Sequence, residues 1–257
     1  MPVVRINGKQ LSYWVGGKGL SDREKTVLFI HGSGGSQLVW SYQKAFFEKG
    51  FDPIVIELSG HGSSDGTGEE EVGRYTEEIR GLLRALGLSR VFVVGHSMGG
   101  AIAQTLALAD PGMLKGIALV GTGARLKVAP FILEGLLAHF EETVRKISTF
   151  AYSPKVSPEL LERGISLLLR CRPEVLHRDF LTCDRFDLIS DVGRIDLPAL
   201  IVCGAEDQLT PVRYSEFLHS HIQGSRLEIL PGAGHMVMIE APEAFNEKVG
   251  AFARDVL

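Results

Sequence analysis

The sequence is poor in the features that mark membrane proteins, exported proteins and nucleic-acid-binding proteins. It has no uninterrupted apolar stretch of about 18 residues, so we expect no membrane span. Polar residues such as Arg5, Asn7 and Lys9 interrupt the first 19 residues, which argues against a signal-peptide core. Lys and Arg number 27 against 31 Asp and Glu. This balance gives no basic face that would neutralise phosphates, so we expect no nucleic-acid partner.

Cysteine is also scarce. The chain has only Cys171, Cys183 and Cys203, an odd number at spacings that match no zinc pattern. We therefore expect reduced thiols and a cytoplasmic protein. His219 and His221 lack an acidic or cysteine partner at a recognised spacing, so no metal site is expected.

What the chain does have is enough apolar sequence for a sizeable core. Its 257 residues are 45% hydrophobic, which predicts one large domain or one domain with an insertion. Short runs rich in Val and Ile are typical of strands buried on both faces. These runs cover residues 27–30, 54–56, 91–94, 117–120, 199–202 and 227–230.

Helical patterns separate most of these runs. They cover residues 40–49, 70–86 and 98–109. A succession of strand, helix and strand predicts the α/β class, with a mostly parallel, twisted central sheet and helices on both faces. At the start of the chain, Asn7-Gly8 between residues 3–6 and 11–15 indicates a hairpin with a type I′ turn, which would add antiparallel edge strands.

The alternation stops between residues 121 and 191. Helical patterns follow one another at residues 131–147, at 158–170 and from Pro173 towards residue 189. We interpret residues 121–191 as a helical cap inserted after the sixth strand, with a core formed by residues 1–120 and 192–257. The cap contains ten basic and ten acidic residues, which gives no reason to favour an anionic substrate.

The strongest chemical signal is Gly-His-Ser-Met-Gly at residues 95–99, between the strand at 91–94 and the helix that starts at Met98. Glycines on both sides of a serine let strand and helix approach closely, and the tight turn pushes the hydroxyl out at the end of the sheet. The alternative interpretation is an ordinary glycine-rich turn with a capping serine. In this context the pattern predicts a nucleophilic Ser97.

With this motif the sequence resembles the α/β-hydrolase family over nearly the whole chain outside the insertion. The family order of serine, acid and histidine implies that Asp207 and His235, each just past a predicted strand, complete a catalytic triad with Ser97. His235 would accept the serine proton, and Asp207 would orient the imidazole. Glu206 is the alternative acid, and the family spacing favours Asp207.

The resemblance also implies an oxyanion hole, the pair of backbone N–H groups that binds the developing negative charge. Met98 would supply one N–H. The other would come from Ser33, or alternatively Gly34, in the loop His-Gly-Ser-Gly-Gly-Ser at residues 31–36. Gln37 stands where a dinucleotide-binding loop needs glycine, so no cofactor is expected. His31 and His61 lie in glycine turns and are expected to be structural.

These residues together predict a serine hydrolase that cleaves small-molecule carboxylic esters through an acyl-enzyme. A serine at position 97 argues against the dehalogenase and epoxide hydrolase branches, which need a carboxylate there. The alternatives are a hydrolase of carbon–carbon bonds or enol-lactones, a related synthase or lyase, and a small-molecule receptor on the same fold. Family members that cleave carbon–carbon bonds often carry Trp just after the catalytic histidine. Met236 follows His235 here, which weakens the carbon–carbon alternative.

Leu and Phe in the cap favour uncharged esters with short to medium acyl chains. The sequence leaves the oligomeric state open.

Overall fold

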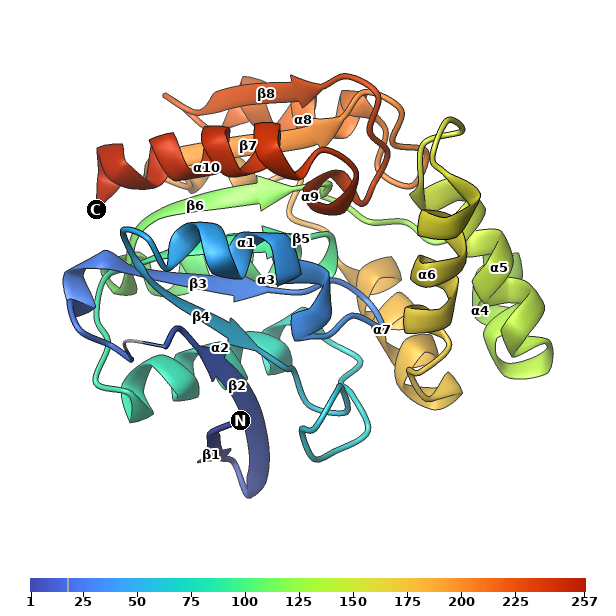
Figure 1. The fold of residues 1–257 in the computed structure, drawn as a ribbon, viewed down its shortest axis with the longest axis horizontal. Helices are drawn as coiled ribbons and strands as arrows, with labels where there is room; N and C mark the ends of the chain where they lie inside the picture. The colour runs from blue at the N-terminus through green and yellow to red at the C-terminus, as the bar shows by residue number, and fades with distance from the viewer. Residues whose placement is uncertain (18) are drawn as a thin grey trace.

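A computed structural model describes residues 1–17 and 19–257 and contains an eight-stranded sheet in the order β1-β2-β4-β3-β5-β6-β7-β8 (Figure 1). Strands β1 and β2 are antiparallel to their neighbours, and β3 to β8 pair in parallel. The strands are β1 Val3–Ile6, β2 Lys9–Val15, β3 Thr26–Ile30, β4 Asp52–Ile56, β5 Val91–His96, β6 Leu114–Val120, β7 Ala199–Gly204 and β8 Arg226–Leu230. The predicted fold class is confirmed.

The N-terminal hairpin turns as its sequence predicts. Asn7 and Gly8 have φ values of 50° and 82°, and both values belong to a type I′ turn. Asparagine and glycine tolerate this left-handed backbone better than other residues do. The hairpin therefore places β2 against β4 at the edge of the parallel sheet.

Helices cover both faces of the sheet because alternate residues of each buried strand point to opposite sides. On β3, Leu28 and Ile30 pack into one apolar cluster, whereas Val27 and Phe29 pack into the other. The first cluster includes residues of α2 Val72–Ala85, α3 Met98–Ala109 and α8 Val212–His221, and the second includes residues of α1 Ser41–Phe47, α9 Val237–Glu240 and α10 Pro242–Val256. The described residues also form four short 3₁₀ helices, namely Arg23–Lys25, Gln37–Trp40, Pro111–Met113 and Val192–Arg194.

Four further helices lie between β6 and β7 and form a cap beyond the ends of the strands (Figure 1). They are α4 Pro130–Ala138, α5 Phe140–Ala151, α6 Pro158–Leu168 and α7 Pro173–Arg185. They share an apolar cluster of their own, built around Leu136, Val144 and Leu176. In the part of the chain that the structure describes, no helix combines the length and apolar character that crossing a bilayer would require.

The cap helices depart from the sequence prediction in their boundaries. The single helix predicted over residues 131–147 is two helices, because His139 leaves the helical region with φ −142° and ψ 60°. The apolar spacing continues across His139, so periodicity alone gives no sign of the break. The last cap helix also ends at Arg185, short of residue 189.

Candidate active site

Ser97 lies in a strained turn between β5 and α3. Its φ of 53° and ψ of −115° are unfavourable for any residue with a Cβ, and such strain is kept only where the surroundings enforce it. Here the Ser97 N–H donates to the Val120 carbonyl over 2.9 Å, and the Thr122 hydroxyl donates to the Ser97 carbonyl over 2.9 Å. These contacts fix the backbone of the turn and leave the side chain half-buried at the cavity wall.

Two glycines make this turn possible. A Cβ at position 95 would lie 2.2 Å from the Gly99 carbonyl oxygen, and a Cβ at position 99 would lie 2.4 Å from the Ile30 oxygen. Any side chain at either position would push β5, α3 and β3 apart. The glycine pattern of the motif thus has a steric origin in this fold.

Asp207 and His235 follow β7 and β8 and meet at the same end of the sheet. The His235 Nδ1 atom lies 2.9 Å from Asp207 Oδ2 and 3.1 Å from Thr210 Oγ1. The Thr210 hydroxyl donates to the same carboxylate oxygen over 2.8 Å, and the Leu209 and Thr210 N–H groups donate to Oδ1. Burial alone would raise the pKa of Asp207, but the neighbouring His235 and these hydrogen bonds lower it overall. Asp207 is therefore a carboxylate.

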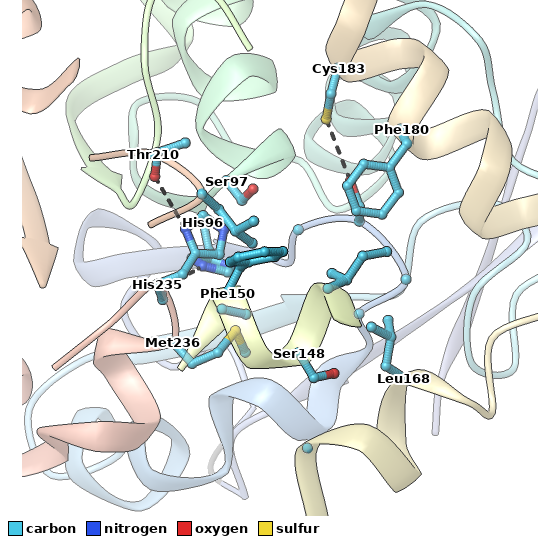
Figure 2. A pocket seen from close by; sticks show the side chains of 18 of the residues that line it. His96, Ser97, Ser148, Phe150, Leu168, Phe180, Cys183, Thr210, His235 and Met236 are labelled. Carbon is cyan, nitrogen blue, oxygen red and sulfur yellow. Dashed lines mark hydrogen bonds between the residues drawn. The ribbon is translucent and has the colours of Figure 1, made fainter. Parts of the chain in front are cut away.

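With Nδ1–H directed at Asp207, the other ring nitrogen of His235 is the one able to accept a proton. Figure 2 shows His235 and Ser97 at the same end of the cavity, and both line it. The backbone of His235 is held by the cap, since its N–H donates to the Ala151 carbonyl over 2.8 Å. Glu240 adds a second tie, because its two carboxylate oxygens accept from Gly234 N–H and Ser153 N–H.

The structure separates the two candidate acids. Glu206 accepts a hydrogen bond from the Ser153 hydroxyl, and its second oxygen lies 3.9 Å from Lys155 Nζ. It thus contacts the cap, whereas Asp207 contacts His235. Thr210 completes the hydrogen bonds of Asp207, and the sequence analysis did not predict this role. A threonine three residues after an acid in a loop can donate its hydroxyl and its backbone N–H to that acid, and this spacing was the available signal.

The loop after β3 lies against the Ser97 turn. A Cβ at Gly32 would be 2.9 Å from Ser97 Cβ, and the Ser33 hydroxyl lies 3.8 Å from Met98 Sδ. Within residues 1–17 and 19–257, neither the Ser33 N–H nor the Met98 N–H donates a hydrogen bond to the protein. The Gly34 N–H is already occupied, since it donates to Asp179 Oδ2 over 2.8 Å. The geometry therefore leaves Ser33 and Met98 available, and not Gly34.

A cavity of about 380 Å³ opens between these loops and the cap. Its walls are largely apolar, and among the described residues that line it Lys127 is the one lysine, arginine or acidic side chain. Apolar cap side chains form part of these walls, among them Phe131, Ile132, Leu167 and Leu168. Leu136 is buried within the cap and Leu137 is 63% exposed. Figure 2 shows Phe150, Phe180 and Leu168 around the space next to Ser97.

Comparison with known proteins gives a consistent result. The sequence profile of the alpha/beta hydrolase family matches residues 27–248. A pimeloyl-[acyl-carrier protein] methyl ester esterase of Neisseria meningitidis is 26% identical over 243 residues, which cover 89% of this chain and 93% of the relative. The 3-oxoadipate enol-lactonase 2 of Acinetobacter baylyi is 28% identical over 244 residues, 91% of this chain and 90% of the relative.

Solved structures agree with the fold. A thermophilic esterase superposes with a TM-score of 0.87 at 38% identity, covering 99% of this chain and 97% of its own. The enol-lactonase from Burkholderia xenovorans LB400 superposes with a TM-score of 0.91 at 23% identity, covering 98% of this chain and 99% of its own. At that identity the second likeness shows a shared fold.

Proposed function

The chain belongs to the alpha/beta hydrolase family, and from this premise we propose that it is a serine hydrolase that cleaves uncharged carboxylic esters. One observation carries the proposal: Ser97 and His235, whose Nδ1 atom contacts Asp207, line one apolar cavity next to the Ser33 and Met98 N–H groups, which have no partner in the described part of the chain. Its relatives include esterases and an enol-lactonase, which supports hydrolysis as the reaction class.

In the proposed reaction the Ser97 oxygen attacks the ester carbonyl carbon while His235 Nε2 takes the hydroxyl proton. Asp207 stabilises the imidazolium that forms and keeps the proton on Nδ1. The carbonyl oxygen becomes an oxyanion, which the N–H groups of Ser33 and Met98 bind. His235 then gives its proton to the departing alkoxide, and the acyl group stays on Ser97. A water molecule then attacks the acyl-enzyme while His235 takes its proton, and the carboxylic acid leaves Ser97, which regains its proton from His235.

The cavity supports small to medium, largely apolar substrates. Transferring an acyl chain from water to apolar walls is worth about 0.8 kcal/mol per methylene. An anionic acyl group would lose its hydration in such a cavity. The charge of Lys127 would offset little of this loss, because its Nζ atom already lies 3.6 Å from Asp184 Oδ1. In this proposal residues 121–191 form the cap that closes the site, and residues 1–120 and 192–257 form the hydrolase core.

An enol-lactone is the second candidate substrate, favoured by the 28% identical lactonase. A lactone is a cyclic ester, so the same attack by Ser97 opens the ring and keeps the alcohol attached to the acyl chain.

A labelling experiment combined with a substrate panel tests the proposal. An alkyl fluorophosphonate should modify Ser97, as located by peptide mass spectrometry, and Ser97→Ala should abolish the label. The panel should contain nitrophenyl esters, thioesters, lactones and a ring-fission dienoate. Label on another residue would contradict the nucleophile assignment, and saturable binding of the esters without turnover would favour the receptor.

A further inference from the structure

A buried carboxylate connects the cap to the loop that carries Ser33. Asp179 lies on cap helix α7 and has no exposed surface. Its Oδ2 atom accepts from the Gly34 N–H and from His61 Nε2, each over 2.8 Å, and its Oδ1 atom accepts from the Tyr75 hydroxyl over 2.6 Å. All three donors belong to the core, so this single cap side chain bonds to three separate segments of it.

The partners of His61 show that this is an ion pair. Its Nδ1 atom lies 3.0 Å from the Ser59 carbonyl and its Nε2 atom faces Asp179, so both ring nitrogens meet acceptors and both carry hydrogen. Burial alone would lower the pKa of His61, but Asp179 outweighs burial and raises it well above the ordinary value. A charged imidazolium thus holds the carboxylate in place beside Gly34.

Core residues hold the peptide that joins Gly32 and Ser33, which precedes Gly34 in the loop. The Leu58 N–H donates to His31 Nε2, so the hydrogen of this ring is on Nδ1, which donates to the Gly32 carbonyl over 2.8 Å. The Gly35 N–H donates to the same carbonyl over 3.0 Å. Because a trans peptide is planar, the Ser33 N–H points away from the Gly32 carbonyl, and holding that carbonyl restricts this N–H from one side only.

The next peptide depends on the cap. Gly34 has a φ of 64°, and a Cβ there would lie 2.5 Å from Leu168 Cδ1 and 2.6 Å from Leu176 Cδ1. The cap therefore packs directly on Gly34 and also accepts its N–H through Asp179. Ser33 lies between a peptide held by the core and a peptide held by the cap.

We propose that Asp179 is a positioning residue for the oxyanion hole, which orients the Ser33 N–H by holding Gly34 from the cap. The proposal rests on the proposed function, since it requires an oxyanion formed by attack of Ser97. It implies that the oxyanion hole is complete when α7 is seated on the core. Asp179 touches no reacting atom, and its effect passes through the loop backbone.

A pair of inhibitors measures this effect directly. When an alkyl trifluoromethyl ketone binds, the Ser97 oxygen adds to the carbonyl carbon and its proton moves to His235, so the ketone oxygen becomes an oxyanion. An alkyl methyl ketone of the same chain length fills the cavity as an unreacted ketone. The ratio of their inhibition constants therefore reports oxyanion binding, and a loosened cavity would weaken both inhibitors together.

Variants at position 179 separate the hydrogen bond from the charge. Asp179→Ala removes the acceptor of the Gly34 N–H and should lower the ratio by about 10- to 100-fold, with a matching fall in kcat and a small change in KM. Asp179→Asn loses the charge but keeps one oxygen that can accept from Gly34, so it should retain most of the ratio. If the alanine variant is too unstable to purify, Asp179→Leu fills the same space without an acceptor.

Thr182→Val is the matched control. Thr182 is also buried on α7, and its hydroxyl donates across to the Glu69 carbonyl over 2.8 Å, away from the loop. It should weaken the cap contact and leave the inhibitor ratio unchanged. An unchanged ratio in Asp179→Ala, an equal loss in Thr182→Val, or an Asp179→Asn ratio as low as that of alanine would each overturn the proposal. If the wild type does not prefer the trifluoromethyl ketone, the proposed function itself fails.

Discussion

His96 donates its Nε2 hydrogen to the backbone carbonyl of His235 over 3.0 Å. Burial, reinforced by the neighbouring His235, lowers the pKa of His96 to about 3, so the donor ring is neutral across the ordinary pH range. His96 lies next to Ser97 in the strand-to-helix turn. The turn that presents the proposed nucleophile thus also holds the backbone of the proposed base, and it does so with an uncharged group.

Replacing His96 should weaken catalysis through the position of His235. His96→Phe removes the donor and leaves the His235 carbonyl unpaired, which at about 1–1.5 kcal/mol corresponds to roughly a tenfold loss in kcat/KM. His96→Gln can place an amide donor near the same point and should recover most of the activity. Steady-state kinetics with one nitrophenyl ester compare the three proteins, and equal losses in both variants would argue against this hydrogen bond.

The acid assignment predicts unequal effects at two neighbouring positions. Asp207→Asn should lower kcat by about a thousandfold or more, because an amide cannot stabilise the imidazolium and favours the wrong tautomer of His235. Glu206→Gln should keep kcat within about threefold, since Glu206 bonds to Ser153 and lies near Lys155 in the cap. Turnover of the best ester in the panel provides the comparison. A larger loss at Glu206 would reverse the assignment.

The buried His61–Asp179 pair predicts how stability depends on pH. The pKa of His61 is raised in the folded protein, so the pair contributes fully below the unfolded value of about 6.5 and the contribution is lost as pH rises through the folded pKa. His61→Gln should therefore destabilise the protein by about 2 kcal/mol at pH 6, and by less at alkaline pH.

Urea denaturation from pH 6 to pH 10 checks this dependence. His219→Gln is the matched control, because His219 is exposed on α8 and its ring bonds to Ser225 alone among the described side chains. It should follow the wild type at every pH. A gap between wild type and His61→Gln that widens with pH would contradict the ion pair.

The limited volume of the cavity, about 380 Å³, predicts an optimum in acyl chain length. From acetyl upwards, each methylene that enters the cavity adds about 0.8 kcal/mol, so kcat/KM should rise about fourfold per step and then fall when the space is full. Leu167 lines the cavity, so Leu167→Ala should enlarge the cavity and move the optimum to longer acyl chains. Leu137→Ala, on the exposed surface of the cap, should not. A steady rise to long chains would mean an open groove.

Much of this arrangement could be predicted because the information is local. Apolar runs mark the buried strands, and the parallel sheet collects the residues that follow β5, β7 and β8 at one end. Ser97 comes directly after β5, and Asp207 and His235 follow a few residues after the ends of β7 and β8, so their meeting follows from the topology. The same logic places Ser33 after β3.

Asp179 could not be predicted in this way. In the sequence it is one of ten acidic residues in a cap with balanced charge. Its burial depends on Gly34, His61 and Tyr75, which lie 145, 118 and 104 residues away. Helical periodicity gives its position on α7, but its partners come from the docking of the cap. The break at His139 could not be predicted either, because the apolar spacing continues where one helix ends and the next begins.

The insertion of the cap between two adjacent strands makes it exchangeable in principle. Strands β6 and β7 pair in parallel, with Ile117 opposite Ala199, so the sheet register does not depend on the length of chain between them. A transplanted cap of another size would bring a new cavity and a new substrate range. To preserve catalysis it would have to reproduce two polar connections: an acceptor for the Gly34 N–H, and a carbonyl like that of Ala151 for the His235 N–H. Cap engineering in this scaffold is thus a problem of matching backbone hydrogen bonds before reshaping the cavity.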